Sequence, residues 1–310
     1  MSRDARLRLA MTGLHPDRMR ALVESCGSAA AVLRAVGRGR VEVSRRAMAA
    51  LARPASELRR VLGDLGVRPV YLGDGDYPPS LGGIPDAPDV LFVRGTLPAV
   101  PAVAVVGTRR CTAYGRNLAR ADGAAIAAAG WTTVSGLARG IDAEAHQGTV
   151  DAGGPGIAVL GSGSNVIYPA EHRRLHDRLV ETGGAVVTEY PPGTPPEAWR
   201  FPPRNRIIAG LSAVVVVVEA AVKGGALITA SAALDQGTTV LAVPGDVGRV
   251  ASEGCNLLIR DGAVPVLGPE DLVEAVSLIV GPPRPRSGPA RHEEADDERI
   301  LSVLGPTGAS

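Results

Sequence analysis

The sequence predicts an α/β protein in which a doubly wound parallel sheet follows a small helical N-terminal domain. From Val103 onward, short unbroken runs of Val, Ile and Ala alternate with longer segments, several of them of helix length. Such runs, without alternation, are typical of parallel strands buried on both faces. Before residue 69, apolar residues instead recur at roughly helical spacing between glycines. The 310 residues are enough for about two domains.

Residues 1–68 are predicted to form short helices with a large basic excess. They contain fourteen Arg and six acidic residues, a net charge of +8, whereas residues 69–283 have a net charge of −6. This excess has two interpretations: a solvated helical face, or an auxiliary surface for nucleic acid or another partner.

The chain after residue 68 is predicted to alternate strands and helices. Residues 69–100, rich in Pro, Gly and Asp, are expected to form a connecting segment with a short edge strand at Val90–Val93. Six buried strands follow, at Val103–Val106, Thr132–Val134, Ile157–Leu160, Ala185–Val187, Val214–Val218 and Val240–Val243. Segments such as Arg116–Ala129 and Ala226–Gln236 supply the crossover helices. Residues 281–290 read as a Pro-rich linker, and His292–Leu304 as a helix of a truncated domain or a disordered tail.

The composition excludes several classes of protein. Lys223 is the one lysine and no GxxxxGK[ST] motif is present, which argues against an ordinary P-loop ATPase. Three distant cysteines form no CxxC pair, which indicates reduced thiols and neither a disulfide framework nor a zinc site. The N-terminus lacks the apolar segment of a signal peptide, and the longest apolar stretch, Ile207–Val218, is too short to cross a bilayer. We therefore expect a cytoplasmic protein without membrane association.

No catalytic or metal-binding constellation is evident. His172 and His176 are four residues apart but lack the HExxH glutamate, so a solvated helical pair is the favoured interpretation. His146 follows Asp142 and Glu144, acids that suit a helix N-terminus. We expect no catalytic residue, no cofactor and no resident metal.

Four loops at predicted strand ends contain residues suited to phosphate. They are Gly107–Arg110, Ser135–Gly140, Gly161–Ser164 and Lys223–Gly225. Small residues let backbone N–H groups approach an anion. Glycine turns are ordinary in α/β loops, but four at one sheet edge favour a phosphate-bearing ligand. GxGxxG is missing after the first strand, which disfavours a dinucleotide.

Two stretches of the acidic part are locally basic. Residues 103–121 and 198–218 contain several arginines and no acid. The second alternates aromatic and guanidinium groups at Trp199-Arg200-Phe201. Stacking combined with phosphate contacts is how proteins bind single strands. The alternative is that Trp199 and Phe201 pack the loop onto the core.

These motifs, in this order, resemble the DNA-processing protein A (DprA/Smf) family, and the resemblance extends from about Asp76 to Leu267. The matching segments are Ala104–Arg110, Tyr114-Gly115, Ser135–Asp142 with His146, Gly161–Gly163, Tyr168-Pro169, Glu189-Tyr190, Phe201–Leu211, Lys223–Ala230, Val243–Gly245 and Gly254–Asn256. The run FPPRNRIIAGL is the most specific of them.

The resemblance implies three parts: a helical, SAM-like domain over residues 1–68, an extended Rossmann-like domain over 69–280, and a linker with the start of a truncated winged-helix domain over 281–310. It implies a single-stranded DNA-binding recombination mediator, not an enzyme. Such a protein protects incoming DNA and loads RecA during natural transformation and DNA repair. Family members commonly dimerise through the segment that corresponds to about Gly254–Leu267.

The resemblance and the basic loops together predict a set of DNA-binding residues. They are Arg109, Arg110, Gly161, Ser162, Gly163, Arg200, Phe201, Arg204, Asn205, Arg206, Lys223 and Gly224. Relatives often have a lysine three residues before the phenylalanine, where this chain has Ala198. Arg200 is the candidate to replace that charge.

The alternative is a nucleotide-processing enzyme similar to the LOG/lysine-decarboxylase-like group. Its PGGxGTxxE motif would align with Lys223–Ser231, where the first two glycines match. Leu227, Ile228 and Ser231 replace its third glycine, its threonine and its glutamate. Without that carboxylate, N-glycosidic hydrolysis lacks its acid–base group. A purely structural scaffold is disfavoured by the arginines at the strand ends.

Overall fold

The computed structural model describes residues 2–284, and its first part is helical as predicted. The helices are α1 (Arg3–Ala10), α2 (Pro16–Cys26), α3 (Ala29–Gly37), α4 (Arg45–Ala52) and α5 (Ala55–Asp64). Ser28 and Ser44 cap α3 and α4, each accepting a hydrogen bond from a backbone N–H of the first turn. The predicted helix at His292–Leu304 lies outside the described residues.

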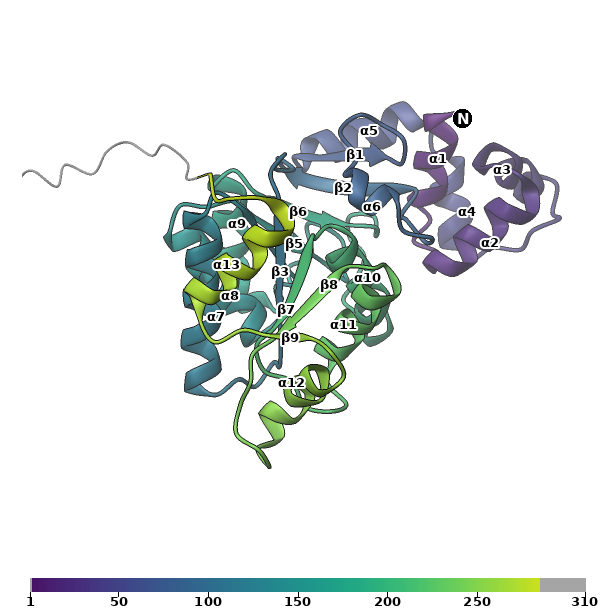
Figure 1. Cartoon of the computed structure of the whole chain (residues 1–310). Helices are drawn as coiled ribbons and strands as arrows, with labels where there is room; N and C mark the ends of the chain where they lie inside the picture. The colour runs from purple at the N-terminus through teal and green to yellow at the C-terminus, as the bar shows by residue number, and fades with distance from the viewer. Residues whose placement is uncertain (1, 285–310) are drawn as a thin grey trace, which may run out of the picture.

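A nine-stranded sheet forms the centre of the molecule, in the order β1-β2-β6-β5-β4-β3-β7-β8-β9 (Figure 1). The strands are β1 (Val67–Tyr71), β2 (Val90–Gly95), β3 (Ala102–Val106), β4 (Thr132–Ser135), β5 (Gly156–Val159), β6 (Ala185–Thr188), β7 (Val214–Val217), β8 (Thr239–Ala242) and β9 (Val264–Pro265). The six predicted strands are confirmed as β3 to β8, and neighbours among them pair in parallel.

The prediction of an edge strand at Val90–Val93 is wrong. This segment lies in β2, which pairs antiparallel with β1 on one side and with β6 on the other. Its first four residues are all buried, as expected of an inner strand. The edge position belongs to β1, where Pro69, which cannot donate to a ladder, is tolerated.

Helices cover both faces of the sheet, which makes the fold an extended Rossmann-like three-layer α/β structure (Figure 1). One face carries α6 (Pro79–Gly82), α10 (Phe201–Gly210), α11 (Gly225–Asp235) and α12 (Val250–Arg260). The other face carries α7 (Ala113–Ala128), α8 (Ile141–Asp151), α9 (Arg173–Glu181) and α13 (Pro269–Val280). The predicted crossover helices correspond to α7 and α11. No helix within residues 2–284 is both long and apolar enough to cross a bilayer.

The N-terminal helices share a core with the antiparallel end of the sheet. Leu7 and Leu58 pack with Val67 and Phe92, all of them buried. The Arg6 guanidinium lies over the Tyr71 ring at 5.2 Å from its centroid and is buried with it. The predicted boundary between residues 68 and 69 therefore falls inside β1, and the division into domains stays a prediction.

The solvated pair expected for His172 and His176 is wrong for His176, whereas His172 is half-buried, with Nδ1 2.9 Å from the carbonyl oxygen of Leu137. His176 on α9 is fully buried, with Nε2 3.3 Å from the carbonyl oxygen of Ser164 and Nδ1 3.1 Å from the Asp177 carboxylate. His146 on α8 is also fully buried, and burial lowers its pKa to about 3. It is therefore uncharged at neutral pH, a core residue beneath the strand ends.

Candidate functional site

The main cleft lies where the sheet changes its winding direction. β3 and β7 are neighbours, but α7 follows β3 onto one face while α11 follows β7 onto the other. Ligands of open α/β sheets bind at the carboxyl ends of strands at such a point. The cleft has a volume of about 680 Å³. Its lining includes Gly107, Thr108, Arg109, Arg110, Tyr168, Phe201, Arg204, Asn205, Gly224 and Gly225.

Phe201 and Arg109 form the centre of this cleft. Phe201 is the first residue of α10, and the two prolines that follow it suit the first helical turn, where N–H groups have no intrahelical partner. The Arg109 guanidinium carbon lies 5.4 Å from the centroid of the Phe201 ring. The Tyr168 ring is 5.6 Å away from the Phe201 ring, and 42% of Tyr168 is exposed. The site thus offers aromatic faces beside an exposed cation.

Arg204 lies beneath this pair as a fixed, buried cation. Its Nη1 donates a hydrogen bond to the carbonyl oxygen of Val159 (2.6 Å). A Cβ at Gly136 would overlap its guanidinium, so the close approach of chain and guanidinium requires glycine there. Burial lowers the pKa of Arg204 to about 10, partly opposed by the charge of Asp142. The group is therefore protonated at neutral pH, but it is not free to follow a ligand.

A carboxylate of the protein itself occupies the N-terminus of α7. Both oxygens of Glu219 accept hydrogen bonds from Thr112, one from its backbone N–H (2.9 Å) and one from its hydroxyl (2.6 Å). A Cβ at Gly115 would overlap this carboxylate. In dinucleotide-binding folds the pyrophosphate lies at this helix N-terminus. Glu219, which follows β7 and which the sequence analysis did not single out, therefore blocks that site.

Two of the four predicted phosphate loops have N–H groups engaged by other groups of the protein, which corrects the expectation for them. In the first loop, the Thr108 N–H donates to the backbone carbonyl oxygen of Glu219 (2.7 Å) and the Arg110 N–H to the Thr108 hydroxyl (3.3 Å). In the second, the Asp142 carboxylate accepts hydrogen bonds from the N–H groups of Gly136 (3.1 Å) and Ala138 (3.4 Å). Burial raises the pKa of Asp142, an effect that Arg204 opposes. A phosphate approaching either loop would meet a carboxylate as well as the arginines.

The third loop, Gly161–Gly163, is buried and packs against the Phe201 ring of the cleft. The Gly163 N–H donates to the carbonyl oxygen of Thr194 (3.0 Å), and the Ser162 hydroxyl donates to that of Val166 (2.8 Å). A Cβ at Gly161 would press on the Phe201 ring. The fourth loop is open: Gly224 and Gly225 line the cleft, and Lys223 is exposed beside them.

Arg200 and Arg206 are not presented to the cleft. Arg200 is 7% exposed, lies 4.1 Å over the Trp199 ring and pairs with Glu197 (3.3 Å). This burial argues against its replacing the charge missing at Ala198. The Arg206 guanidinium makes two hydrogen bonds to the Glu189 carboxylate (2.8 and 2.9 Å) and contacts Asp86 (2.8 Å). Because Arg200 and Arg206 are buried and paired, they are less available to a ligand than the exposed Arg109.

Asn205 lies in the cleft, whereas Trp199 packs against the N-terminal part of the chain. Asn205 lines the cleft, and its amide donates to the carbonyl oxygen of Gly225 (3.3 Å), which joins α10 to α11. Trp199 stacks on His15, with 4.9 Å between ring centroids, and Arg200 covers its ring. The packing interpretation therefore fits Trp199, although it packs onto the N-terminal helices and not onto the sheet core. Tyr168 lies in one of the segments that match the family but is not among the predicted DNA-binding residues; the sequence signal for it is an aromatic ring in a polar loop.

Comparisons with known proteins agree with this architecture. The model of a family described as DNA recombination-mediator protein A matches residues 68–277. Protein Smf of Escherichia coli is 48% identical over 200 residues, which are 64% of this chain and 54% of that protein. DNA processing protein DprA of Bacillus subtilis is 39% identical over 224 residues, 70% of this chain and 75% of that protein. The chain spans about half the length of the Smf proteins it matches.

Two solved structures resemble the chain. DNA processing protein A of Streptococcus pneumoniae superposes with a TM-score of 0.67 at 31% identity, over 86% of this chain and 95% of that one. DNA processing protein A of Helicobacter pylori, whose structure is described as giving insight into its single-stranded DNA binding mode, superposes with a TM-score of 0.59 over 68% of this chain and 95% of that one. At 24% identity the second likeness shows the fold alone.

Proposed function

The chain belongs to the DNA recombination-mediator protein A family, and on that premise we propose that it binds single-stranded DNA in the cleft and mediates DNA recombination. The observation that carries this proposal is the stacking of the exposed Arg109 guanidinium on the Phe201 ring in an open cleft. An unpaired base can stack on an aromatic ring while the neighbouring phosphate meets the guanidinium. In a duplex the bases are stacked on each other and cannot reach the ring.

The contacts divide into two kinds. Arg109, Arg110 and Lys223 are exposed cations that can follow a phosphate chain, while Phe201 and Tyr168 offer ring faces. Arg200, Arg204 and Arg206, with the loop at residues 161–163, are proposed to hold these groups in place. In this arrangement, the arginines after β3 supply the positive charge that relatives often have at the position of Ala198.

The proposed activity is binding without turnover. The two carboxylates nearest the cleft, Asp142 and Glu219, are each tied to backbone N–H groups of the protein. The family resemblance supports a finer role, in which the protein protects incoming strands in the cytoplasm and loads RecA on them during natural transformation and DNA repair. That role belongs to the proposal.

Single-stranded DNA is expected to bind more tightly than duplex, without strong sequence preference, because phosphates and ring faces are common to all sequences. Its affinity should fall steeply as salt rises, since bound counterions are released. Fluorescence anisotropy with labelled strands of mixed sequence at several salt concentrations measures both. Equal affinity for the two forms, or an affinity independent of salt, would count against the proposal.

A homodimer is the second part of the proposal. β9 is the open edge of the sheet, and Val264 and Leu267 beside it are largely exposed, whereas Leu258 and Ile259 pack partly against the chain's own core. Leu267→Asp is expected to convert a dimer into a monomer in light scattering at roughly tens of micromolar protein, in the range of ordinary transient affinities. Leu278→Asp, on the exposed side of α13, is the matched control and should leave the dimer intact. A monomeric wild-type protein would refute this part.

A further inference from the structure

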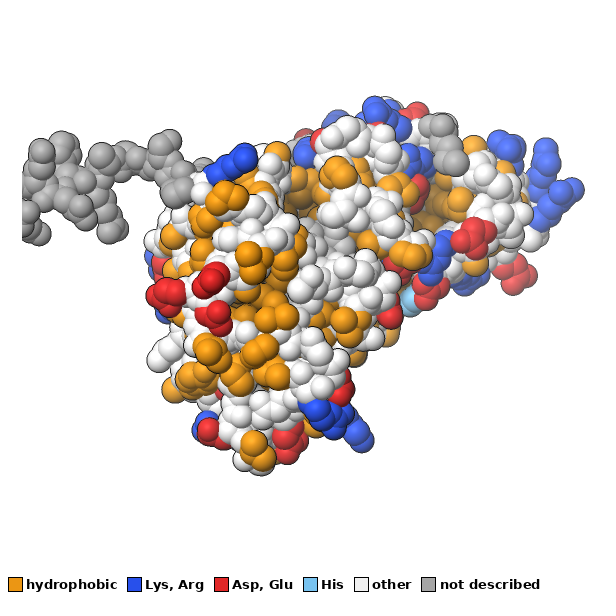
Figure 2. All heavy atoms as spheres, viewed as in Figure 1, with side chains coloured by type: hydrophobic (Ala, Val, Ile, Leu, Met, Phe, Trp, Pro, Cys, Tyr) orange, Lys and Arg blue, Asp and Glu red, His pale blue; other side chains and the backbone are white. Residues whose placement is uncertain are grey.

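Five exposed arginines gather on the N-terminal helices, between the end of α3 and the start of α4. They are Arg34, Arg38, Arg40, Arg45 and Arg46, which we call the α3–α4 arginines. Within residues 34–46 the one acidic residue is Glu42, so the segment has a net charge of +4. Figure 2 shows blue side chains projecting at the end of the molecule that α2 and α3 form in Figure 1.

Most other basic residues of the N-terminal helices form ion pairs, which the α3–α4 arginines do not. Arg3 pairs with Asp74 (2.8 Å), Arg6 with Asp89 (2.7 Å) and Arg59 with Asp4 (2.6 Å). Two further pairs are Arg53 with Glu57 (2.9 Å) and Arg60 with Asp64 (3.8 Å). No carboxylate in residues 2–284 lies within ion-pairing distance of any α3–α4 arginine. Arg8 and Arg18 also have no carboxylate partner, but each donates to a backbone carbonyl oxygen, that of Leu51 and that of Glu42. The basic excess of residues 1–68 is therefore concentrated at the α3–α4 arginines.

Folding does not account for this placement. Arg45 and Arg46 are the first two residues of α4, whose first turn contains no acid. The N-terminus of a helix carries a partial positive charge, so cations there are unfavourable. The residues that pack α4 are Ala47 and Leu51, while both arginines are exposed. A polyanion bound here would relieve the repulsion that the fold leaves in place.

The chemistry of the surface selects phosphate and offers nothing for bases. Residues 1–70 contain no Phe, Tyr or Trp, so an unpaired base finds no ring to stack on. Guanidinium groups bind phosphates well, and duplex DNA has one phosphate charge per about 1.7 Å of its axis, a denser array than a single strand. We propose that the α3–α4 arginines bind the phosphate backbone of duplex DNA, without reading its sequence.

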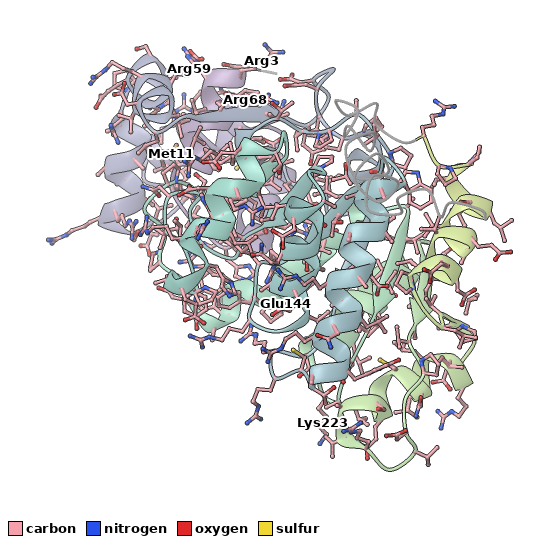
Figure 3. The ribbon with its side chains drawn as sticks, turned by 90° about the vertical axis from the view of Figure 1, so that its left-hand side faces the viewer. Arg3, Met11, Arg59, Arg68, Glu144 and Lys223 are labelled. Atoms are coloured by element: carbon pink, nitrogen blue, oxygen red, sulfur yellow. The ribbon has the colours of Figure 1, made fainter. Side chains whose placement is uncertain are left out.

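This surface is separate from the cleft, although the two parts of the chain that carry them are in contact. The stack of His15 on Trp199 joins α2 to the loop just before Phe201. No α3–α4 arginine lines the cleft, whose lining residues all lie between 106 and 229. In Figure 3, Arg3 and Arg59 of the same N-terminal part lie at the opposite end of the molecule from Lys223. Duplex and single strand would therefore contact different parts of the protein, as at a junction between the two.

The test compares two triple variants of the full chain by anisotropy, with a short blunt duplex and a short single strand as separate probes. Arg40→Gln, Arg45→Gln and Arg46→Gln together remove three unpaired charges, whereas Arg53→Gln, Arg59→Gln and Arg60→Gln remove three paired charges from the next segment, between the end of α4 and α5. The first variant is expected to bind duplex at least about tenfold more weakly at low salt, with a salt slope reduced by roughly 0.9 per lost phosphate contact. The second should bind duplex like the wild type, and thermal melting should find both variants folded.

The duplex proposal can be tested independently of the single-strand site in the cleft. Phe201→Ala should weaken binding of the single strand and leave duplex binding unchanged, so a failure of the cleft does not affect the duplex result. Unchanged duplex affinity in the first triple variant, or an equal loss in both, would overturn the proposal. Loss of binding to vesicles of anionic lipid without loss of duplex binding would overturn it in favour of a membrane surface.

Discussion

Arg206→Ala is expected to lower the free energy of unfolding by about 3–5 kcal/mol, because it leaves a buried carboxylate without its partner. Glu189 is 3% exposed and receives two hydrogen bonds from Arg206, which itself is 12% exposed. The substitution also removes the contact between Arg206 and Asp86, which joins α10 to the loop before β2. Denaturant unfolding gives the size of the loss, and anisotropy below the transition should show little change in single-strand affinity.

Two controls separate pairing from packing at Arg206. Arg260→Ala breaks an ion pair in which both side chains are mostly exposed, and should cost less than about 1 kcal/mol. Replacing both partners, with Arg206→Met and Glu189→Leu, should recover much of the lost stability, since no buried carboxylate is left unpaired and Asp86, which is 33% exposed, can be solvated. If Arg206→Ala were as stable as the wild type but bound DNA weakly, Arg206 would be a DNA contact after all.

Phe201→Ala is expected to weaken single-strand binding by roughly 1–3 kcal/mol, about 5-fold to 150-fold, with little change in its salt dependence. Stacking releases few counterions, so the slope of affinity against salt should stay near that of the wild type. Arg109→Ala, in contrast, removes the cation over the same ring and should lower that slope by about 0.7, the value for one phosphate contact on a single strand. One salt titration therefore distinguishes the two contributions.

Tyr114→Ala is the matched control, because it removes an exposed ring that does not line the cleft. Thermal melting must accompany the series, since Phe201 also packs against Gly161. If Phe201→Ala and Arg109→Ala both bound like the wild type, the cleft would not be the DNA site.

The sequence by itself predicted the six parallel strands, the crossover helices and the helical N-terminal part. It could do so because an unbroken apolar run such as Val214–Val218 is stabilised by burial of its side chains on both faces of a sheet, whichever strands lie beside it. It also placed Arg109 and Gly224 at strand ends and Phe201 in a basic stretch, and the structure brings all three into one cleft. These conclusions depend on local pattern and on the general rule that strand ends share an edge.

Only the tertiary structure decided which charged and polar groups are free. The sequence does not distinguish Arg206 from Arg109. In the structure, Arg206 pairs with Glu189 and Asp86 from other parts of the chain, whereas Arg109 is exposed. The loop after β3 looks open until Glu219, more than a hundred residues later, occupies the helix N-terminus behind it. Whether a charged side chain is desolvated or paired depends on which carboxylate lies within a few ångströms of it in space. The spacing of residues along the chain does not give that distance.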